Sequence, residues 1–213
     1  MPAERFADRR WRLLALLALW PLTTLAYQLA GWLAGLRGAA PAWVLPVDAA
    51  MPLLPWTLAI YLSLGLFCLV PAWQDDPARF RRLLRAALGS LAACCLVFVA
   101  VPAAIDRGTL PDGWWGQAYA WLRYVDPPHN TCPSLHVAYV VLVLAAAPRR
   151  WWTAAWGLAI IVSTLTTRQH ILIDVAAGTA LALAAWRLAG RWDQGRHTAA
   201  ADGSASIKAG SRD

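Results

Sequence analysis

The chain has 213 residues, of which 59% are hydrophobic and only 15% are charged, and its formal net charge is +7. A soluble domain of this composition would expose large apolar patches to water, so the composition indicates a membrane protein and argues against a soluble one. The positive charge does not call for a nucleic-acid partner, because arginines gathered on one side of a membrane account for it.

Six apolar stretches follow one another along the chain, close to the roughly 20 residues that cross a bilayer as a helix. They cover residues 13–36, 53–73, 83–105, 135–147, 152–165 and 171–188. Between the third and the fourth, apolar residues from Trp114 to Val125 recur at helical spacing, which predicts a short helix lying in the membrane interface. The expected fold class is therefore all-α, a polytopic membrane protein built as a bundle of six transmembrane helices.

The predicted bundle occupies residues 1–190, and the polar segment 191–213, rich in small residues, is expected to be a disordered cytoplasmic tail. With the N-terminus inside, fifteen lysines and arginines fall on the cytoplasmic side, and only Arg37, Arg107 and two other arginines fall outside. This bias predicts that both termini are cytoplasmic. In a bacterium the chain would be a multi-pass inner-membrane protein with its outer face toward the periplasm.

Two short segments gather the polar chemistry of the outer side. They are "CPSLH", which opens the fourth apolar stretch, and "RQHILID", which opens the sixth. His170 and Asp174 are four residues apart, so on a helix they share one face and the carboxylate can reach an imidazole nitrogen. Both helices run inward from the outer side, so their N-termini would converge. Free amides at two helix starts form an anion site, for which phosphate is the natural guest.

These residues also carry a family resemblance. "PSLH" followed by "HILID" resembles the second and third motifs of the type 2 phosphatidic acid phosphatase superfamily, which includes lipid phosphate phosphatases, vanadium haloperoxidases, and inositol-phosphoceramide and sphingomyelin synthases. The leucine of "PSLH", its lead-in "DPPHNTC" and the context "QHILIDVAAG" are more similar to the synthase-like branch.

Two features depart from the family pattern. The first motif, a lysine followed by a nearby Arg-Pro pair, is missing, and Arg107 is its nearest positional candidate. The third motif usually has an arginine several residues before its histidine, where this chain has Thr164, and Arg168 lies closer to that histidine.

The resemblance implies an integral membrane lipid phosphatase or phosphotransferase that forms a phosphohistidine. His170 would attack phosphorus, Asp174 would orient its ring, and His136 would protonate the leaving oxygen. The phosphoryl oxygens would be held by Ser134, Arg168 and Arg107. No metal or other cofactor is implied. The substrate would be a membrane lipid carrying a phosphate or phosphodiester, and no obligate protein partner is inferred. Resolution by water or by a lipid or polyol hydroxyl stays open.

Two other classes of protein remain as alternatives. His136 and His170, on two helices at one face, could ligate a b-type haem, or with Asp174 a metal. The missing first motif is also compatible with a catalytically silent membrane scaffold. Asp48 is expected to be interfacial rather than functional, and Asp126 to shape its loop.

Overall fold

The computed structural model describes residues 6–126 and 128–210, with side chains among them as far as residue 192. Within this part the fold is helical apart from two short parallel strands, β1 (Ala40–Pro41) and β2 (Ala103–Ala104), so the all-α class is confirmed. The helices are α1 (Arg9–Arg37), α2 (Pro46–Ala49), α3 (Thr57–Leu62), α4 (Leu64–Phe67), the 3₁₀ helix η2 (Val70–Trp73), α5 (Pro77–Ala100), α6 (Gly113–Val125), α7 (Leu135–Ala146), α8 (Trp151–Thr166) and α9 (Leu172–Gly210).

Three helices in the described part are long and apolar enough to cross a membrane. They are α1, α5 and the portion of α9 from Leu172 to Trp192. Helices α7 and α8, and the segment Thr57–Phe67, are apolar but shorter. These apolar helices support the prediction of a membrane protein. Three of the six predicted spans coincide with helices of spanning length. Six complete crossings stay a proposal.

The second predicted span, residues 53–73, differs most from expectation, because it forms α3, α4 and η2 instead of one helix. Ser63 ends α3 and begins α4, and its amide bonds to the carbonyls of both Ala59 and Ile60. Gly65 is a poor helix former, and Pro71 has no backbone N–H to continue an α-helix. The break in the helix therefore comes from the local backbone properties of these residues, although the segment is apolar.

Helix α7 lies at the centre of the bundle. It packs against α5, α8 and α9, while α5 also packs along α1 and α9. Val137, Ala138 and Val140 of α7 are fully buried, as expected of a helix with neighbours on several sides. Helix α1 instead exposes large apolar side chains such as Leu17 and Leu25, which suits a face in contact with lipid.

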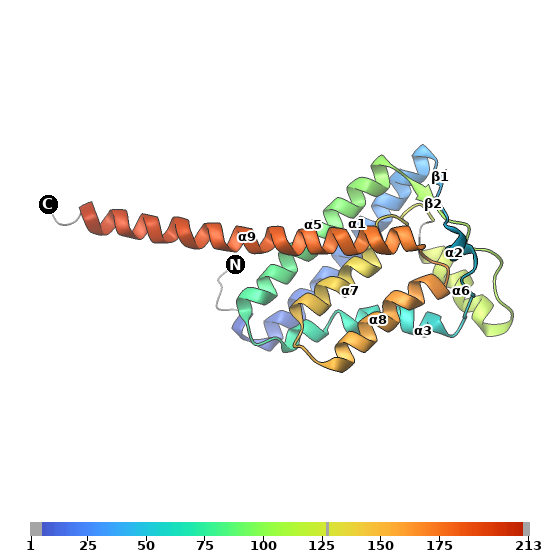
Figure 1. The fold of residues 1–213 in the computed structure, drawn as a ribbon, viewed down its shortest axis with the longest axis horizontal. Helices are drawn as coiled ribbons and strands as arrows, with labels where there is room; N and C mark the ends of the chain where they lie inside the picture. The colour runs from blue at the N-terminus through green and yellow to red at the C-terminus, as the bar shows by residue number, and fades with distance from the viewer. Residues whose placement is uncertain (1–5, 127, 211–213) are drawn as a thin grey trace.

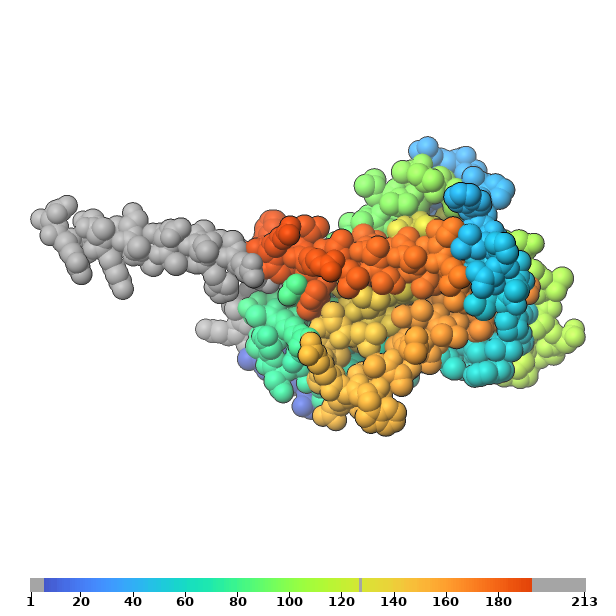
Figure 2. Space-filling view, viewed as in Figure 1, coloured from blue at the N-terminus to red at the C-terminus, as the bar shows by residue number. Residues whose placement is uncertain are grey.

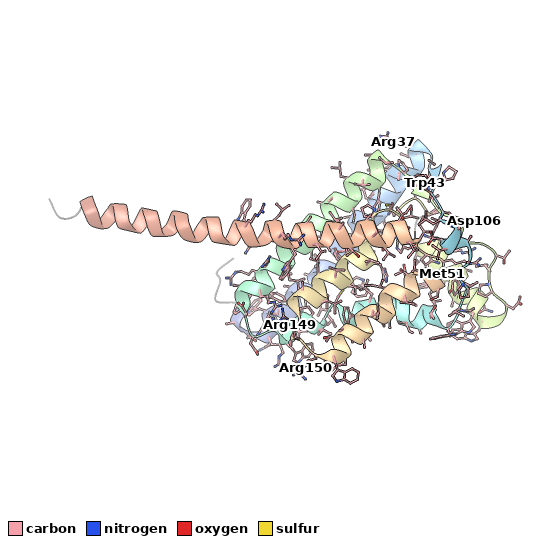
Figure 3. The ribbon with its side chains drawn as sticks, viewed as in Figure 1. Arg37, Trp43, Met51, Asp106, Arg149 and Arg150 are labelled. Atoms are coloured by element: carbon pink, nitrogen blue, oxygen red, sulfur yellow. The ribbon has the colours of Figure 1, made fainter. Side chains whose placement is uncertain are left out.

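The two ends of the bundle differ in character. Figure 1 shows both termini at one end and β1, β2, α2 and α6 at the opposite end, where α9 begins. In Figure 2 the blue-to-cyan segment of residues 40–60 covers that second end. Figure 3 places Met51 and Asp106 there, whereas Arg149 and Arg150 lie at the other end of α7. The polar loops and the basic α7–α8 turn thus occupy opposite ends.

Two further expectations concern α6 and the tail. A helix forms over Gly113–Val125 as predicted, with Tyr119 and Leu122 buried and Trp114 and Trp121 exposed; its place at a membrane interface stays a prediction. Helix α9 continues to Gly210, past the expected boundary at residue 190. The separate catalytic domain and disordered cytoplasmic tail remain predictions, and residues 211–213 lie outside the described part.

Candidate active site

The starts of α7 and α9 lie directly against each other. Ser134 is the N-cap of α7: its Oγ atom accepts a hydrogen bond from the Val137 amide at 3.2 Å, and its own amide donates to the Asp174 carbonyl at 3.1 Å. A Cβ atom added at Gly178 would collide with the Ser134 carbonyl oxygen. The two histidine motifs, far apart in sequence, are thus brought together by a close helix contact that needs glycine on α9.

His170 and Asp174 form a buried pair at the start of α9. The Nδ1 atom of His170 lies 3.3 Å from the Asp174 Oδ2 atom, and the two residues are only 8% and 1% exposed. The His170 amide donates to the Thr164 carbonyl, which fixes the turn between α8 and α9. Because a carboxylate accepts, the neutral ring carries its hydrogen on Nδ1 and has its lone pair on Nε2.

His136, the second residue of α7, is positioned by α3. Its ring stacks on Tyr61 with centroids 4.0 Å apart, and its Nε2 atom lies 3.1 Å from the Tyr61 carbonyl oxygen. Because a carbonyl can only accept, Nε2 carries the hydrogen and Nδ1 is the atom with a lone pair. His170 and Asp126 are among the ionisable neighbours that act electrostatically on His136. The ring is therefore held in one orientation near the His170 pair.

The two histidines border different cavities. His136 lines an apolar cavity of about 260 Å³ between α1, the α3–α4 region, α5 and α7. His170 lines a smaller and more polar cavity of about 130 Å³, which also includes Arg168, Asp48 and Asp106 among apolar neighbours. The surroundings of His136 are therefore apolar, and those of His170 are more polar.

Arg168 reaches the polar cavity from a strained backbone position. Its φ angle is +54°, a left-handed value that non-glycine residues rarely adopt. Its guanidinium donates to the Met51 carbonyl at 3.3 Å and approaches Gly108 closely enough that an added Cβ would lie 3.1 Å from Nη1. Of the three predicted phosphate-binding residues, Arg168 is the one that shares a cavity with His170.

Arg107 is held in an ion pair with Asp126, and its predicted contact with phosphate stays a prediction. Its Nη2 atom lies 2.6 Å from Asp126 Oδ2, and its Nη1 atom donates to the Asp126 carbonyl. Tyr27 donates to the other carboxylate oxygen of Asp126 at 2.7 Å, while Arg123 donates to the Arg107 carbonyl. The charge of Arg107 is thus already balanced by the Asp126 carboxylate.

The amides at the start of α9 are occupied, so the expectation of free N–H groups there is wrong for two residues. Ile171 donates to Asp174 Oδ2 at 3.1 Å, and Leu172 donates to Asp48 Oδ1 at 2.8 Å. The other Asp48 oxygen accepts from the Leu45 amide. Buried amides require partners, and here two carboxylates supply them.

Sequence reasoning missed the roles of two residues that shape this region, Tyr61 and Asp48. Tyr61 is 75 residues from His136, and Asp48 is 124 residues from Leu172. Local spacing carries no signal for such contacts. Asp126, by contrast, was expected to shape its loop, and its carboxylate accepts from Tyr27 and Arg107.

Cys132 lies beside the buried carboxylate of the site. Burial, followed by the charge of Asp174 and a hydrogen bond to it, raises the pKa of the Cys132 thiol to about 11. No group of three or more His, Cys, Asp or Glu side chains suited to a metal ion occurs in the described part of the chain. The Asp174 carboxylate accepts from the Ile171 amide and faces His170 and this thiol.

The comparison with protein families fits this arrangement. The family model of the PAP2 superfamily matches residues 36–188, which is more than half of the chain and includes all six candidate residues. Comparison with curated proteins and with solved structures gave no match. Membership supports a phosphatase-type lipid phosphoesterase and suggests phosphoric ester hydrolase activity. The match covers both histidine motifs and the loops that position them, and the chain belongs to the PAP2 superfamily.

Proposed function

We propose that the protein is an integral membrane enzyme that cleaves a lipid-borne phosphate ester or phosphodiester through a phosphohistidine on His170. The observation that carries this proposal is the buried His170–Asp174 pair, with 3.3 Å between Nδ1 and Oδ2, next to the helix start that bears His136. A histidine oriented by a carboxylate, with a second histidine nearby, is the arrangement that nucleophilic and acid–base catalysis together need.

In the first half of the reaction the Nε2 lone pair of His170 attacks phosphorus. The bond between phosphorus and the lipid oxygen breaks, and the leaving oxygen takes a proton from Nδ1 of protonated His136, producing a lipid alcohol. Asp174 accepts a hydrogen bond from the Nδ1–H group of His170 and stabilises the positive charge that develops on that ring. His136 is left neutral, with its Nε2 hydrogen still directed at the Tyr61 carbonyl.

In the second half an incoming hydroxyl attacks the phosphohistidine. Neutral His136 takes its proton at Nδ1, the phosphorus–nitrogen bond breaks, and the electron pair returns to Nε2 of His170. Water as the nucleophile gives a phosphatase, and a lipid or polyol hydroxyl gives a phosphotransferase. The likeness of "DPPHNTCPSLH" to the synthase-like branch supports the second outcome at the level of sequence alone.

Arg168 is the residue that we assign to the phosphoryl oxygens. It lines the cavity of His170, and the negative charge of neighbouring Asp48 is spread over two backbone amides. Ser134 is fully buried, and its hydroxyl oxygen already accepts the capping hydrogen bond. It would therefore contact a phosphoryl oxygen by donating its hydroxyl hydrogen. Arg107 is assigned to holding the Asp126 loop.

An enzyme that acts on lipids must have a defined orientation in the membrane. We propose that all six apolar segments cross the membrane with both termini cytoplasmic. The second crossing is then the broken α3–α4–η2 segment. Helices α7 and α8 are short, so the site at the start of α7 lies below the outer headgroup surface, where a phosphate still attached to its chains can enter from the side. The basic turn at Arg149 and Arg150 would be cytoplasmic.

The experiment is turnover of a panel of phosphorylated lipids in detergent, with free phosphate and transferred headgroup measured together. His170→Ala serves as the blank. Release of either product by the wild type but not by the variant supports the enzyme. Equal product in both proteins would overturn the nucleophile assignment, and no turnover of any lipid would favour a silent scaffold. A Soret band or stoichiometric metal in the purified protein would revive the haem or metal alternative.

A further inference from the structure

The apolar cavity beside His136 has the lining and the shape of a hydrocarbon site. Its walls come from α1, the α3–α4 region, α5 and α7, and they are almost entirely apolar. The hydroxyls of Thr23 and Tyr139, two of its few polar groups, bond to each other at 2.9 Å. An apolar cavity of this kind has few partners to offer to water, so its natural occupant is also apolar.

The cavity is elongated along the bundle. On α7 its lining runs from His136 to Val143, a rise of about 10 Å, and on α1 it runs from Leu16 to Thr24, about 12 Å. The Thr23–Tyr139 bond joins α1 and α7 within this length. A single extended hydrocarbon chain has this form, with its polar end at His136.

His136 gives the cavity its place in the reaction. In the mechanism above, the oxygen that leaves phosphorus receives its proton from His136, whereas the phosphoryl group is carried by His170. His136 borders the apolar cavity, and His170 borders the more polar one together with Arg168. The group attached to the leaving oxygen therefore belongs on the apolar side.

Trp20 forms part of the cavity wall, and it is packed on Gly65. The indole side chain is 54% exposed overall, and a Cβ atom added at Gly65 would collide with its six-membered ring. Any side chain at position 65 must displace this ring. The contact between α1 and α4 thus sets the width of the cavity through one large residue and one residue with no side chain.

We propose that this cavity binds the hydrocarbon chain of the departing lipid alcohol, and that Trp20 seated on Gly65 determines which chain lengths are accepted. The inference rests on the proposed function, since it concerns the lipid that His136 releases. The cavity is then a chain-binding site, and Trp20 and Gly65 are its two specificity-determining positions.

The first test is kinetic, with phosphatidic acids whose saturated chains increase in length. Gly65→Leu should lower kcat/KM for the longest chains by about tenfold or more, the loss of roughly two buried methylenes, and spare the shortest. Trp20→Ala should move the preference toward longer or branched chains. The controls are Gly89→Leu, where an added Cβ meets nothing within 4 Å, and Trp32→Ala, on the same helix as Trp20 but outside the cavity. Equal effects at all chain lengths, or the same shift in the controls, would overturn the proposal.

The second test does not depend on turnover. The His170→Ala protein in lipid vesicles is irradiated with a phosphatidic acid that bears a diazirine near the end of its chain, and labelled residues are mapped by mass spectrometry. Label on cavity residues such as Leu142 and Leu16, removed by excess unlabelled phosphatidic acid, is expected. Label spread over lipid-facing residues such as Leu25 and Leu96 would contradict the chain site. Absence of turnover with cavity labelling would reject the proposed reaction while leaving the binding site standing.

Discussion

At the scale of single residues, the proposed mechanism separates groups that make bonds from a group that orients. His170 and His136 exchange bonds and protons in the proposed mechanism, whereas Asp174 only holds the His170 ring and balances its charge. Their substitutions should therefore differ in kind as well as in size.

His170→Ala and His136→Ala should abolish measurable turnover. Asp174→Asn should keep a small remaining activity, reduced by about a thousandfold or more. An asparagine can present its amide NH₂ to Nδ1 and so favour the wrong tautomer, but the nucleophile itself remains. Steady-state kinetics on purified proteins, with circular dichroism as a control for folding, give the comparison. A His136→Ala enzyme with near-normal turnover would remove that residue from the acid–base role.

Cys132 reports on the charge of Asp174 independently of catalysis. Because the pKa of its thiol is raised to about 11, chiefly by burial and then by Asp174, little reactive thiolate exists near neutral pH. Alkylation by iodoacetamide should be slow at neutral pH and accelerate as the pH approaches that value. Asp174→Asn should lower the pKa and speed alkylation at a fixed pH.

The alkylation rates are measured in a background with Cys68, Cys94 and Cys95 replaced by alanine. Asp126→Asn, which changes a carboxylate not among the causes of the Cys132 shift, serves as the matched control. Identical alkylation rates for the Asp174→Asn protein and its parent would show that the carboxylate does not face this thiol.

At the scale of elements, the contact between α7 and α9 holds the two halves of the site together. Gly178→Ala would place a Cβ against the Ser134 carbonyl oxygen, which is backbone and cannot move aside cheaply. We expect both the melting temperature and kcat to fall. In the matched variant Gly89→Ala the new Cβ meets nothing within 4 Å, so the melting temperature should hold or rise slightly because alanine favours helix.

Both glycine variants are compared by thermal unfolding and turnover in the same detergent. A Gly178→Ala protein as stable and active as the Gly89→Ala protein would contradict the close approach of α7 and α9.

The sequence predicted the elements whose signals are local. Long apolar runs identified α1, α5 and α9, and the four-residue spacing of His170 and Asp174 identified their pairing. The broken segment 53–73 was misjudged because its overall hydrophobicity outweighed the warnings of Gly65 and Pro71. Tyr61 under His136 and Asp48 at the start of α9 could not be predicted, because those contacts depend on how distant helices pack.

At the scale of the whole molecule, the proposal requires the polar end of the bundle to face outward. Alkaline phosphatase, used as a reporter, folds only outside the cytoplasm. A fusion of this reporter after Asp126 should therefore be active, and a fusion after Arg150 should be inactive. These junctions flank α7, the helix that carries His136. Activity reversed between the two fusions would place the site on the cytoplasmic side.

The proposed reaction passes through one covalent intermediate, a phosphohistidine on His170. Purified protein mixed with phosphatidic acid labelled in its phosphate should be stopped within a turnover under alkaline conditions, in which a phosphohistidine survives, and its peptides sequenced by mass spectrometry. The account predicts label on His170, absent from the His170→Ala protein. Label on another residue, or turnover in the wild type with none on His170 at any time point, would contradict the central claim.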